Sequence, residues 1–327
     1  MATAEVDGEA RAKRRAEGLV LAAASVTVAL WASSFIAIRS SGEHFGPGAL
    51  AFGRLAVASV VLGAILLARR EGVPPREAWP GIAASGLLWF GAYMVALNWG
   101  EREVDAGTAS MIVNIGPILM ALLGGWLLKE GFPPKLMAGM AVSFAGAVVV
   151  GLATSGGGGS SLLGVLLCLL AAVVYAVGVV LQKPTLKHAT PLQVTTFGAL
   201  VGALACLPFV GQFVSEVGRA PASATLQVVY LGVFPTALAF STWAYAISRS
   251  TAGKMGATTY AVPVLVILMS WLFLGEVPAR LALFGGLLCL AGVAVSRMRG
   301  KAREQVPVDA PEGAAATESG SSTESVR

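Results

Sequence analysis

Apolar residues in this chain come in long runs that are separated by short polar connections. Ten runs have about 20 residues each, the length that crosses roughly 30 Å of hydrocarbon as an α-helix. Inside lipid, every backbone polar group must find a partner within its own segment, so the runs are predicted to be helices rather than isolated strands. The predicted spans are 19–39, 49–68, 81–100, 106–128, 135–153, 162–183, 192–214, 225–247, 254–274 and 281–298. The pattern therefore predicts an all-α polytopic membrane protein with ten transmembrane helices.

These spans belong to an internal repeat that is visible at two fixed offsets. Four residues recur 146 positions later: Pro117 as Pro263, Glu130 as Glu276, Gly139 as Gly285 and Gly146 as Gly292. Three recur 144 positions later: Trp31 as Tyr175, Arg39 as Lys183 and Pro47 as Pro191. Each copy holds five spans, an odd number, so the second copy is predicted to enter the membrane inverted. Two inverted five-helix repeats are the plan of many membrane carriers, whose binding sites lie near the bilayer midplane between the halves.

The repeat also sets the predicted domain organisation. Residues 18–153 and 162–298 are predicted to form the two repeats, joined by a flexible Gly/Ser linker at 154–161. Residues 1–17 and 299–327 are polar and are predicted to be disordered tails. Up to Arg303 and apart from Arg54, seventeen Lys and Arg residues lie in the loops, tail and span ends on the side that holds both termini, and four lie on the other side. Both tails are therefore predicted to be cytoplasmic, with the protein in the plasma (inner) membrane.

Composition and motifs exclude several classes of protein. Hydrophobic residues make up 56% of the chain and charged residues 13%, against about 25% charged residues in soluble domains, so no room remains for a soluble catalytic domain. The net charge of +5 is scattered through short loops, which does not indicate a nucleic-acid partner. Cys168, Cys206 and Cys289 stand singly in apolar runs, which predicts neither a disulfide nor a metal site. The sequence shows no nucleophile–base pair and no Walker-type phosphate loop, so neither an enzyme nor a bound cofactor is expected.

Arg54 is the one charged residue well inside a predicted span. Burying it in the membrane costs about 2.5–3.5 kcal/mol, and residues of this kind usually face a cavity or the bundle interior. It lies about one and a half turns from the outer end of its helix, so snorkelling to that surface is an alternative. Inside the bundle, Arg54 would either cap backbone carbonyls of a neighbouring helix or attract a substrate carboxylate.

Polar and aromatic residues near mid-depth complete the candidate substrate-binding set. Together with Arg54 they are Trp31, Ser34, Trp89, Tyr93, Asn114, Tyr175 and Tyr260. An amide or phenol inside the membrane needs partners, which a shared cavity with water would supply, and interhelical hydrogen bonding is the structural alternative. Aromatic residues nearer the predicted helix ends are assigned to the interfacial belts: Trp99, Trp126, Trp243, Tyr245 and Trp271.

Pro117 and Pro263 each lie about midway along a predicted helix. A proline there removes the bond to the carbonyl four residues back, which belongs to Val113 or Thr259, and bends the helix. The two prolines are candidate hinges of a central cavity, and kinks that merely aid packing are the alternative.

Small and acidic residues near the helix ends have structural interpretations. Each pair of repeated glycines is seven residues apart and shares one helix face, which predicts close packing of the fifth and tenth helices. Glu130 and Glu276 follow the fourth and ninth spans, where capping or pairing at an interface is expected.

Four stretches of the sequence resemble the drug/metabolite transporter superfamily, EamA-type branch. They are LWASSFIAIRS, FGRLAVAS, IGPILMALLGGWLLKE and VPVLVILMSWLFLGE. The resemblance covers residues 18 to about 298 and implies ten helices with both termini cytoplasmic. It also implies transport of small organic solutes, often amino acids or related metabolites moved outward. Lys129 departs from the family pattern, which usually has Gly before this Glu, as Gly275 stands in the second copy.

The expected function is therefore secondary transport by alternating access, with export of amino acids or related compounds as the leading hypothesis. Uptake of a vitamin-like or other small solute and a duplicated membrane channel are the alternatives. The expected partners are a small-molecule substrate and the lipid bilayer, and a homodimer is left open.

Overall fold

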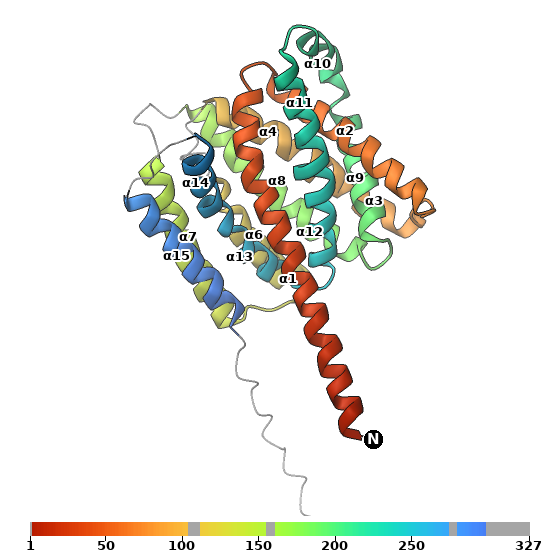
Figure 1. Ribbon diagram of the computed structural model, residues 1–327, viewed down its shortest axis with the longest axis vertical. Coiled ribbons are helices and arrows are strands. Elements are labelled where there is room, and N and C mark those ends of the chain that lie inside the picture. Colours follow the sequence, from red (N-terminus) through yellow and green to blue (C-terminus); the bar gives the residue numbers. More distant parts are fainter. Residues whose placement is uncertain (1, 104–111, 155–160, 275–279, 299–327) are drawn as a thin grey trace, which may run out of the picture.

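The computed structural model describes residues 2–103, 112–154, 161–274 and 280–298, and the regular elements in these ranges are all helical (Figure 1). Residues 155–160 of the predicted linker, the tail at 299–327, the start of the fourth predicted span and Glu276 lie outside the described residues. Within the described ranges, each predicted span corresponds to one helix or to several consecutive helices stacked end to end, which we call a rod. The predicted all-α fold of ten helices in two repeats is confirmed.

The first repeat begins with two plain helices, α1 (Ala2–Ser41) and α2 (Pro47–Ala68). Its third rod is composite and consists of η1 (Arg76–Ala78), α3 (Trp79–Ser85), the π-helical turn η2 (Gly86–Ala92) and α4 (Tyr93–Glu103). The fourth and fifth rods contain α6 (Gly116–Leu127) and α7 (Pro134–Thr154).

The second repeat has the same order of rods. It begins with α8 (Leu162–Thr185) and α9 (Pro191–Ala205), and α9 continues after a bend as η3 (Leu207–Phe209) and α10 (Val210–Val217). The third rod is again composite, with α11 (Ala222–Leu231), the π-helical turn η4 (Gly232–Leu238) and α12 (Ala239–Ile247). The last two rods are α13 (Ala252–Thr259) with α14 (Ala261–Leu274), and α15 (Arg280–Arg297).

Several rods have the length and composition of membrane spans. In the described part of the chain, five helical segments can cross a membrane by these criteria: Arg14–Ile38, Pro47–Ala68, Arg76–Glu103, Leu162–Thr185 and Ala222–Ile247. The bent pair of α9 with η3 and α10 would be a sixth. The protein is therefore a multi-pass membrane protein. We call the end of the bundle where α2, α8 and α12 finish the inner end, because the charge pattern predicts that it faces the cytoplasm.

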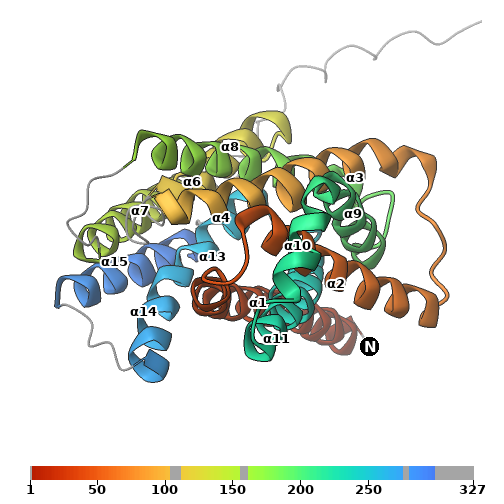
Figure 2. The ribbon, with the colours of Figure 1, turned by 90° about the horizontal axis from the view of Figure 1, so that it is seen from above.

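The contact between α7 and α15, which lie side by side, shows how the two repeats are related (Figures 1 and 2). Ser143 Oγ donates to the Cys289 carbonyl at 3.0 Å, and Cys289 Sγ donates to the Ser143 carbonyl at 3.4 Å. These residues are 146 positions apart, so each repeat uses the same position to contact the other. Reciprocal contacts of this kind mark a two-fold axis between two equivalent units.

Glycine allows α7 and α15 to approach closely. A Cβ on Gly139 would lie 2.5 Å from the Gly292 carbonyl oxygen, and one on Gly146 would lie 2.6 Å from the Gly285 carbonyl oxygen. Any side chain at these positions would push the two backbones apart. The predicted packing of the fifth and tenth helices is confirmed.

The prediction of a disordered tail at 1–17 is wrong, because α1 already begins at Ala2. Residues 2–17 consist largely of Ala, Glu, Arg and Lys, which are strong helix formers. The helix in the apolar part of α1 can propagate into this segment without a second nucleation step. The first span therefore continues beyond the bundle, as the free lower part of α1 shows (Figure 1).

The predicted span 192–214 corresponds to a broken helix, which bends by 55° where α9 ends. Pro208 cannot donate a backbone bond and disfavours helical geometry in the residue before it, so the helix breaks there. Beyond the break, the ring of Phe213 lies 5.9 Å from that of Phe45, and Glu216 Oε2 accepts a hydrogen bond from the Gly46 N–H at 2.9 Å. These contacts fix α10 over the start of α2.

The backbone of the turn after α6 shows why glycine is usual at the position of Lys129. Lys129 has a φ of 55°, in the left-handed region, and Gly131 has a φ of 72°. A left-handed residue with a side chain costs about 1–2 kcal/mol, whereas glycine adopts this geometry without steric cost and loses about 0.5–1 kcal/mol of backbone entropy on folding. The family pattern of glycine at this position therefore has a steric reason.

We predict that Lys129→Gly stabilises the protein by up to about 1 kcal/mol and raises its unfolding temperature in detergent by about 1–3 °C. Lys254→Gly is the matched control, because Lys254 lies in the helical backbone of α13, where glycine destabilises by about 1 kcal/mol. A fall in unfolding temperature for both variants would contradict the left-handed assignment.

We also predict that Gly292→Ala lowers stability by about 1–3 kcal/mol, the usual cost of overpacking. A Cβ there would lie 2.4 Å from the Gly139 carbonyl oxygen, whereas a Cβ on Gly286 of the same helix would find its nearest atom at 3.6 Å. Thermal unfolding in detergent should therefore separate Gly292→Ala from the control Gly286→Ala. Equal unfolding temperatures for the two variants would disprove the close approach of α7 and α15.

Candidate functional site

Seven aromatic rings from both repeats meet inside the bundle, and we call them the aromatic cluster. Its members come from α1, η2, α4, α8 and α12: Trp31, Trp89, Phe90, Tyr93, Tyr175, Phe240 and Trp243. Trp89 lies at the centre and contacts the rings of five other members, with centroids from 4.6 Å for Phe240 to 6.1 Å for Trp31. The structure thus brings together four of the predicted site residues: Trp31, Trp89, Tyr93 and Tyr175.

Polar atoms of the aromatic cluster are buried without hydrogen-bond partners. Among the described residues, the indole Nε1 atoms of Trp31 and Trp243 have no partner, and neither has Tyr175 Oη. A buried donor without a partner costs about 1–3 kcal/mol, so such donors commonly serve a ligand or an ordered water.

Arg54 lies inside the bundle beside the aromatic cluster. Its side chain is 5% exposed, and Nε donates to Thr236 Oγ1 at 3.0 Å. Tyr93 and Glu101, about two turns apart on α4, lie within electrostatic range of the guanidinium. The side chain therefore does not snorkel to the outer surface, and its hydrogen bond goes to a hydroxyl rather than to a backbone carbonyl.

Two π-helical turns position these groups. η2 carries Trp89, and η4 carries Thr236, whose hydroxyl donates to the Leu231 carbonyl five residues back at 2.7 Å. The two turns begin at Gly86 and Gly232, 146 positions apart, so they are the same feature in the two repeats. Isolated π-turns are rare and are often found at functional sites.

The remaining predicted site residues border the aromatic cluster or lie beyond it, and none of their rings is among its ring contacts. Ser34 Oγ donates to the Trp31 carbonyl at 2.7 Å within its own helix. Tyr260 Oη donates to the Asn114 carbonyl at 3.0 Å, a bond between equivalent positions of the two repeats. The Tyr260 ring belongs to a separate buried group with Met140 and Cys289 beside the α7–α15 contact.

The predicted hinge prolines lie just after helix interruptions. A turn at Asn114–Ile115 precedes α6, where Pro117 is the second residue. A turn at Tyr260 separates α13 from α14, where Pro263 is the third residue. Each proline therefore occupies the first turn of a new helix, where its missing N–H leaves no bond unmade.

Trp243 corrects one assignment made from the sequence. It was predicted to belong to an interfacial belt, but it is fully buried and its ring packs in the aromatic cluster. Phe240 lies three residues earlier on the same helix face, and this spacing was the available signal. Trp99, Trp126 and Trp271 are 45%, 73% and 55% exposed, as a residue that faces lipid should be.

An ion pair joins the two repeats at the inner end. Lys183 Nζ of α8 bonds to Glu130 Oε1 and to the Ser250 carbonyl. Glu130 Oε2 accepts from the Ala252 N–H at the start of α13, at 2.8 Å. The predicted interface pairing of Glu130 is therefore confirmed.

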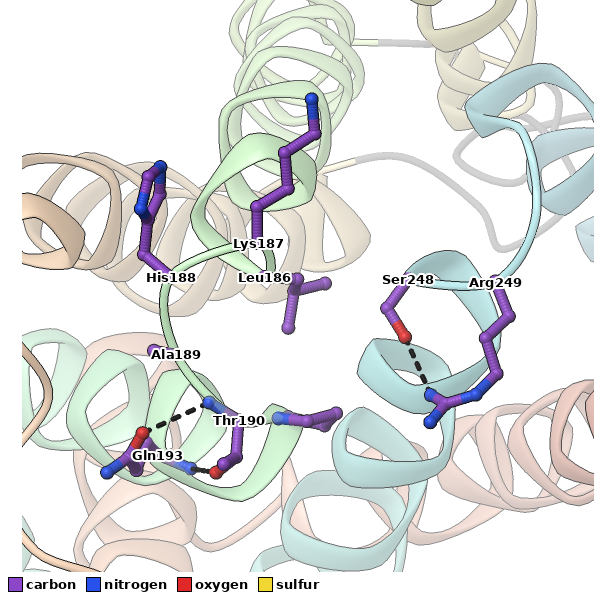
Figure 3. A pocket seen from close by; sticks show the side chains of 9 residues that line it. Leu186, Lys187, His188, Ala189, Thr190, Gln193, Ser248 and Arg249 are labelled. Atoms are coloured by element: carbon purple, nitrogen blue, oxygen red, sulfur yellow. Dashed lines mark hydrogen bonds between the residues drawn. The ribbon is translucent and has the colours of Figure 1, made fainter.

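A surface pocket of about 500 Å³ lies at the inner end, beside the loop that joins α8 to α9 (Figure 3). Its polar groups already have partners: Thr190 and Gln193 cap α9, and Arg249 bonds to the Ser248 hydroxyl. Lys187 and His188 extend away from Thr190 and Gln193 in Figure 3. No set of three or more His, Cys, Asp or Glu residues suited to a metal ion occurs in the described part of the chain.

Comparisons with known proteins agree with this architecture. A model of the EamA-like transporter family matches twice, at residues 18–152 and 162–298. A probable terminal-alkyne amino-acid exporter of Streptantibioticus cattleyicolor is 38% identical over 283 residues, which cover 85% of this chain and 94% of the relative. The uncharacterized transporter YdfC of Bacillus subtilis is 33% identical over 275 residues, which cover 84% of this chain and 90% of YdfC.

A solved crystal structure of a protein with 24% sequence identity shares the fold. Its TM-score is 0.70, and the match covers 85% of this chain and 96% of that one. The family model and the two relatives together cover both repeats. The chain therefore belongs to the EamA-like transporter family.

Proposed function

We propose that this transporter exports amino acids or related compounds across the plasma membrane by alternating access, with both termini in the cytoplasm. The observation that carries the proposal is Arg54, a buried cation within electrostatic range of Tyr93 of the aromatic cluster, in which two indole N–H groups lack partners among the described residues. A guanidinium binds a carboxylate through two parallel hydrogen bonds, and in Arg54 only Nε has an assigned partner among the described side chains. The substrate carboxylate would thus bind at Arg54.

The aromatic cluster suggests the rest of the substrate. Flat, apolar rings favour an apolar or unsaturated side chain, and the indole N–H groups of Trp31 and Trp243 can donate to its polar atoms. The relative from S. cattleyicolor is named for amino acids with a terminal alkyne, a compact π-system of this kind. An amino acid with a short apolar or unsaturated side chain is therefore the proposed cargo.

Alternating access requires helices that can change shape near the binding site. The turns before Pro117 and Pro263 and the π-turns η2 and η4 occur at equivalent positions of the two repeats. We assign them as the hinges around which one repeat rocks against the other. The direction of net transport follows the substrate gradient, so uptake would use the same site, and a homodimer would leave this mechanism unchanged.

The test is transport by the purified protein in proteoliposomes, with radiolabelled L-propargylglycine as the probe. A carrier gives saturable counterflow, in which unlabelled substrate on one side drives accumulation of label on the other. Diffusive equilibration without counterflow would show a channel. Profiling metabolites in cells with and without the gene then tests direction, since loss of an exporter raises the intracellular pool of its cargo.

We predict that Arg54→Gln raises the half-saturating concentration of L-propargylglycine at least tenfold, because one lost charged hydrogen bond is worth about 1.5–3 kcal/mol. Arg54→Lys should keep part of the affinity, since it retains the charge without the fork geometry. Arg69→Gln is the matched control, because Arg69 is exposed at the inner end of the same helix. Unchanged affinity in both Arg54 variants would show that the substrate carboxylate does not bind to Arg54.

We predict that Trp31→Phe and Trp243→Phe each weaken substrate binding about 2- to 12-fold, because an aromatic ring is kept and one hydrogen bond of about 0.5–1.5 kcal/mol is lost. The unfolding temperature of the empty protein should fall only as far as the smaller ring and its cavity require, since the deleted N–H has no partner among the described residues. Trp99→Phe on the exposed face of α4 is the control. Lower stability with unchanged affinity would assign these indoles to packing alone.

A further inference from the structure

Gln182 is a buried polar residue that the proposed site leaves unexplained. Its side chain has no exposed surface, and neither Oε1 nor Nε2 has a hydrogen-bond partner in the part of the chain that the structure describes. Burying an amide without partners costs several kcal/mol on transfer scales. Such a group is expected to serve a ligand or water in some state of the protein.

The position of Gln182 places it on the route from the aromatic cluster to the inner end. It follows Tyr175 by seven residues on α8, so the two side chains share one helix face about 10 Å apart along the axis. Tyr175 belongs to the aromatic cluster, and α8 ends three residues after Gln182. Gln182 is therefore nearer the inner end than the proposed substrate site.

The ion pair of Lys183 and Glu130 lies next to Gln182, and we call it the latch. Lys183 also binds the Ser250 carbonyl, and Glu130 also accepts from the Ala252 N–H. The latch thus ties the end of α8 and the end of the fourth rod to the connection between α12 and α13. Both side chains are partly exposed, 19% for Lys183 and 11% for Glu130, whereas Gln182 directly before Lys183 is fully buried, so the latch holds the end of α8 that carries Gln182.

We propose that Gln182 is a second substrate contact, closed off from the inner solvent by the latch in this conformation. A neutral amide has both a donor and an acceptor, so it can bind the carboxylate and the ammonium of a zwitterion without favouring either charge. Opening the latch exposes Gln182 to substrate from the inner side, and closing it leaves the substrate to move on to the aromatic cluster and Arg54. The zwitterionic ligand rests on the proposed function, whereas the latch does not.

The latch is tested without any substrate, by the reaction of Gln182→Cys with a membrane-impermeant maleimide in inside-out vesicles. The native cysteines are buried, so the unmodified protein is the blank. Adding Lys183→Met or Glu130→Gln should speed labelling at least tenfold, and Glu130→Gln keeps an acceptor for the Ala252 N–H. Lys187→Met, an exposed lysine beyond the end of the same helix, should leave the rate unchanged. Equal labelling rates in all folded variants would overturn the latch.

The substrate contact is tested with Gln182→Leu, which keeps the volume and removes the amide. The half-saturating concentration of L-propargylglycine in counterflow should rise at least tenfold, the value of one hydrogen bond to a charged group. The unfolding temperature should stay equal or rise, because an unpaired buried amide has been removed. A stability gain with unchanged affinity would overturn the contact. If no amino acid is transported, the proposed function fails, and the labelling result still decides the latch.

Discussion

The constraint that shapes this protein is that a helix in hydrocarbon must pair its own backbone groups. A regular α-helix meets that requirement anywhere in the bilayer. A π-helical turn or a break in a helix is tolerated only where neighbouring helices shield its backbone groups from lipid. The irregular turns found here, at Gly86–Ala92, Gly232–Leu238, Asn114–Ile115 and Tyr260, lie where rods of the two repeats meet. Three of them are also tied by a specific hydrogen bond: Thr236 bonds to the Leu231 carbonyl, and Tyr260 bonds to the backbone carbonyl of Asn114. The irregular turns, which are the proposed hinges, thus lie beside the residues proposed to bind substrate.

Duplication supplied the scaffold, and divergence between the copies supplied the site. Arg54 contacts Thr236 of the other repeat's π-turn. The equivalent positions are Gly198 and Phe90, which also meet, since a Cβ on Gly198 would lie 3.1 Å from the Phe90 ring. The same pair of backbone positions therefore carries different side chains in the two repeats. On one side of the axis a hydroxyl, Thr236, binds a buried cation, Arg54. On the other side an aromatic ring, Phe90, packs against Gly198. Under the proposed function, this asymmetry gives the site one partner for a substrate carboxylate rather than two.

Hydropathy and the two offsets were enough to predict the rods and their duplication, because span length and repeat spacing are properties of the sequence alone. Arg54 was identifiable because a charge within an apolar run is costly whatever its neighbours are. Trp243 was misassigned because distance from a helix end does not reveal which helix face is buried, and that depends on packing with Trp31 from a distant part of the chain. The π-turns left no signal in hydropathy, since an extra residue in one turn changes hydrogen bonding rather than composition.

The conformational change of a carrier limits how strongly the ion pair of Lys183 and Glu130 can stabilise the closed conformation. A substrate shifts a conformational equilibrium only by its differential affinity for the two states, so a closure much stronger than a few kcal/mol would trap the protein in one state. Exposed ion pairs contribute about 0–1 kcal/mol, whereas breaking a fully buried pair by removing one partner costs about 3–5 kcal/mol. Lys183 and Glu130 are partly exposed and have backbone partners, which puts their contact between these limits. An ion pair in this range can hold a closed conformation and still open when substrate binds.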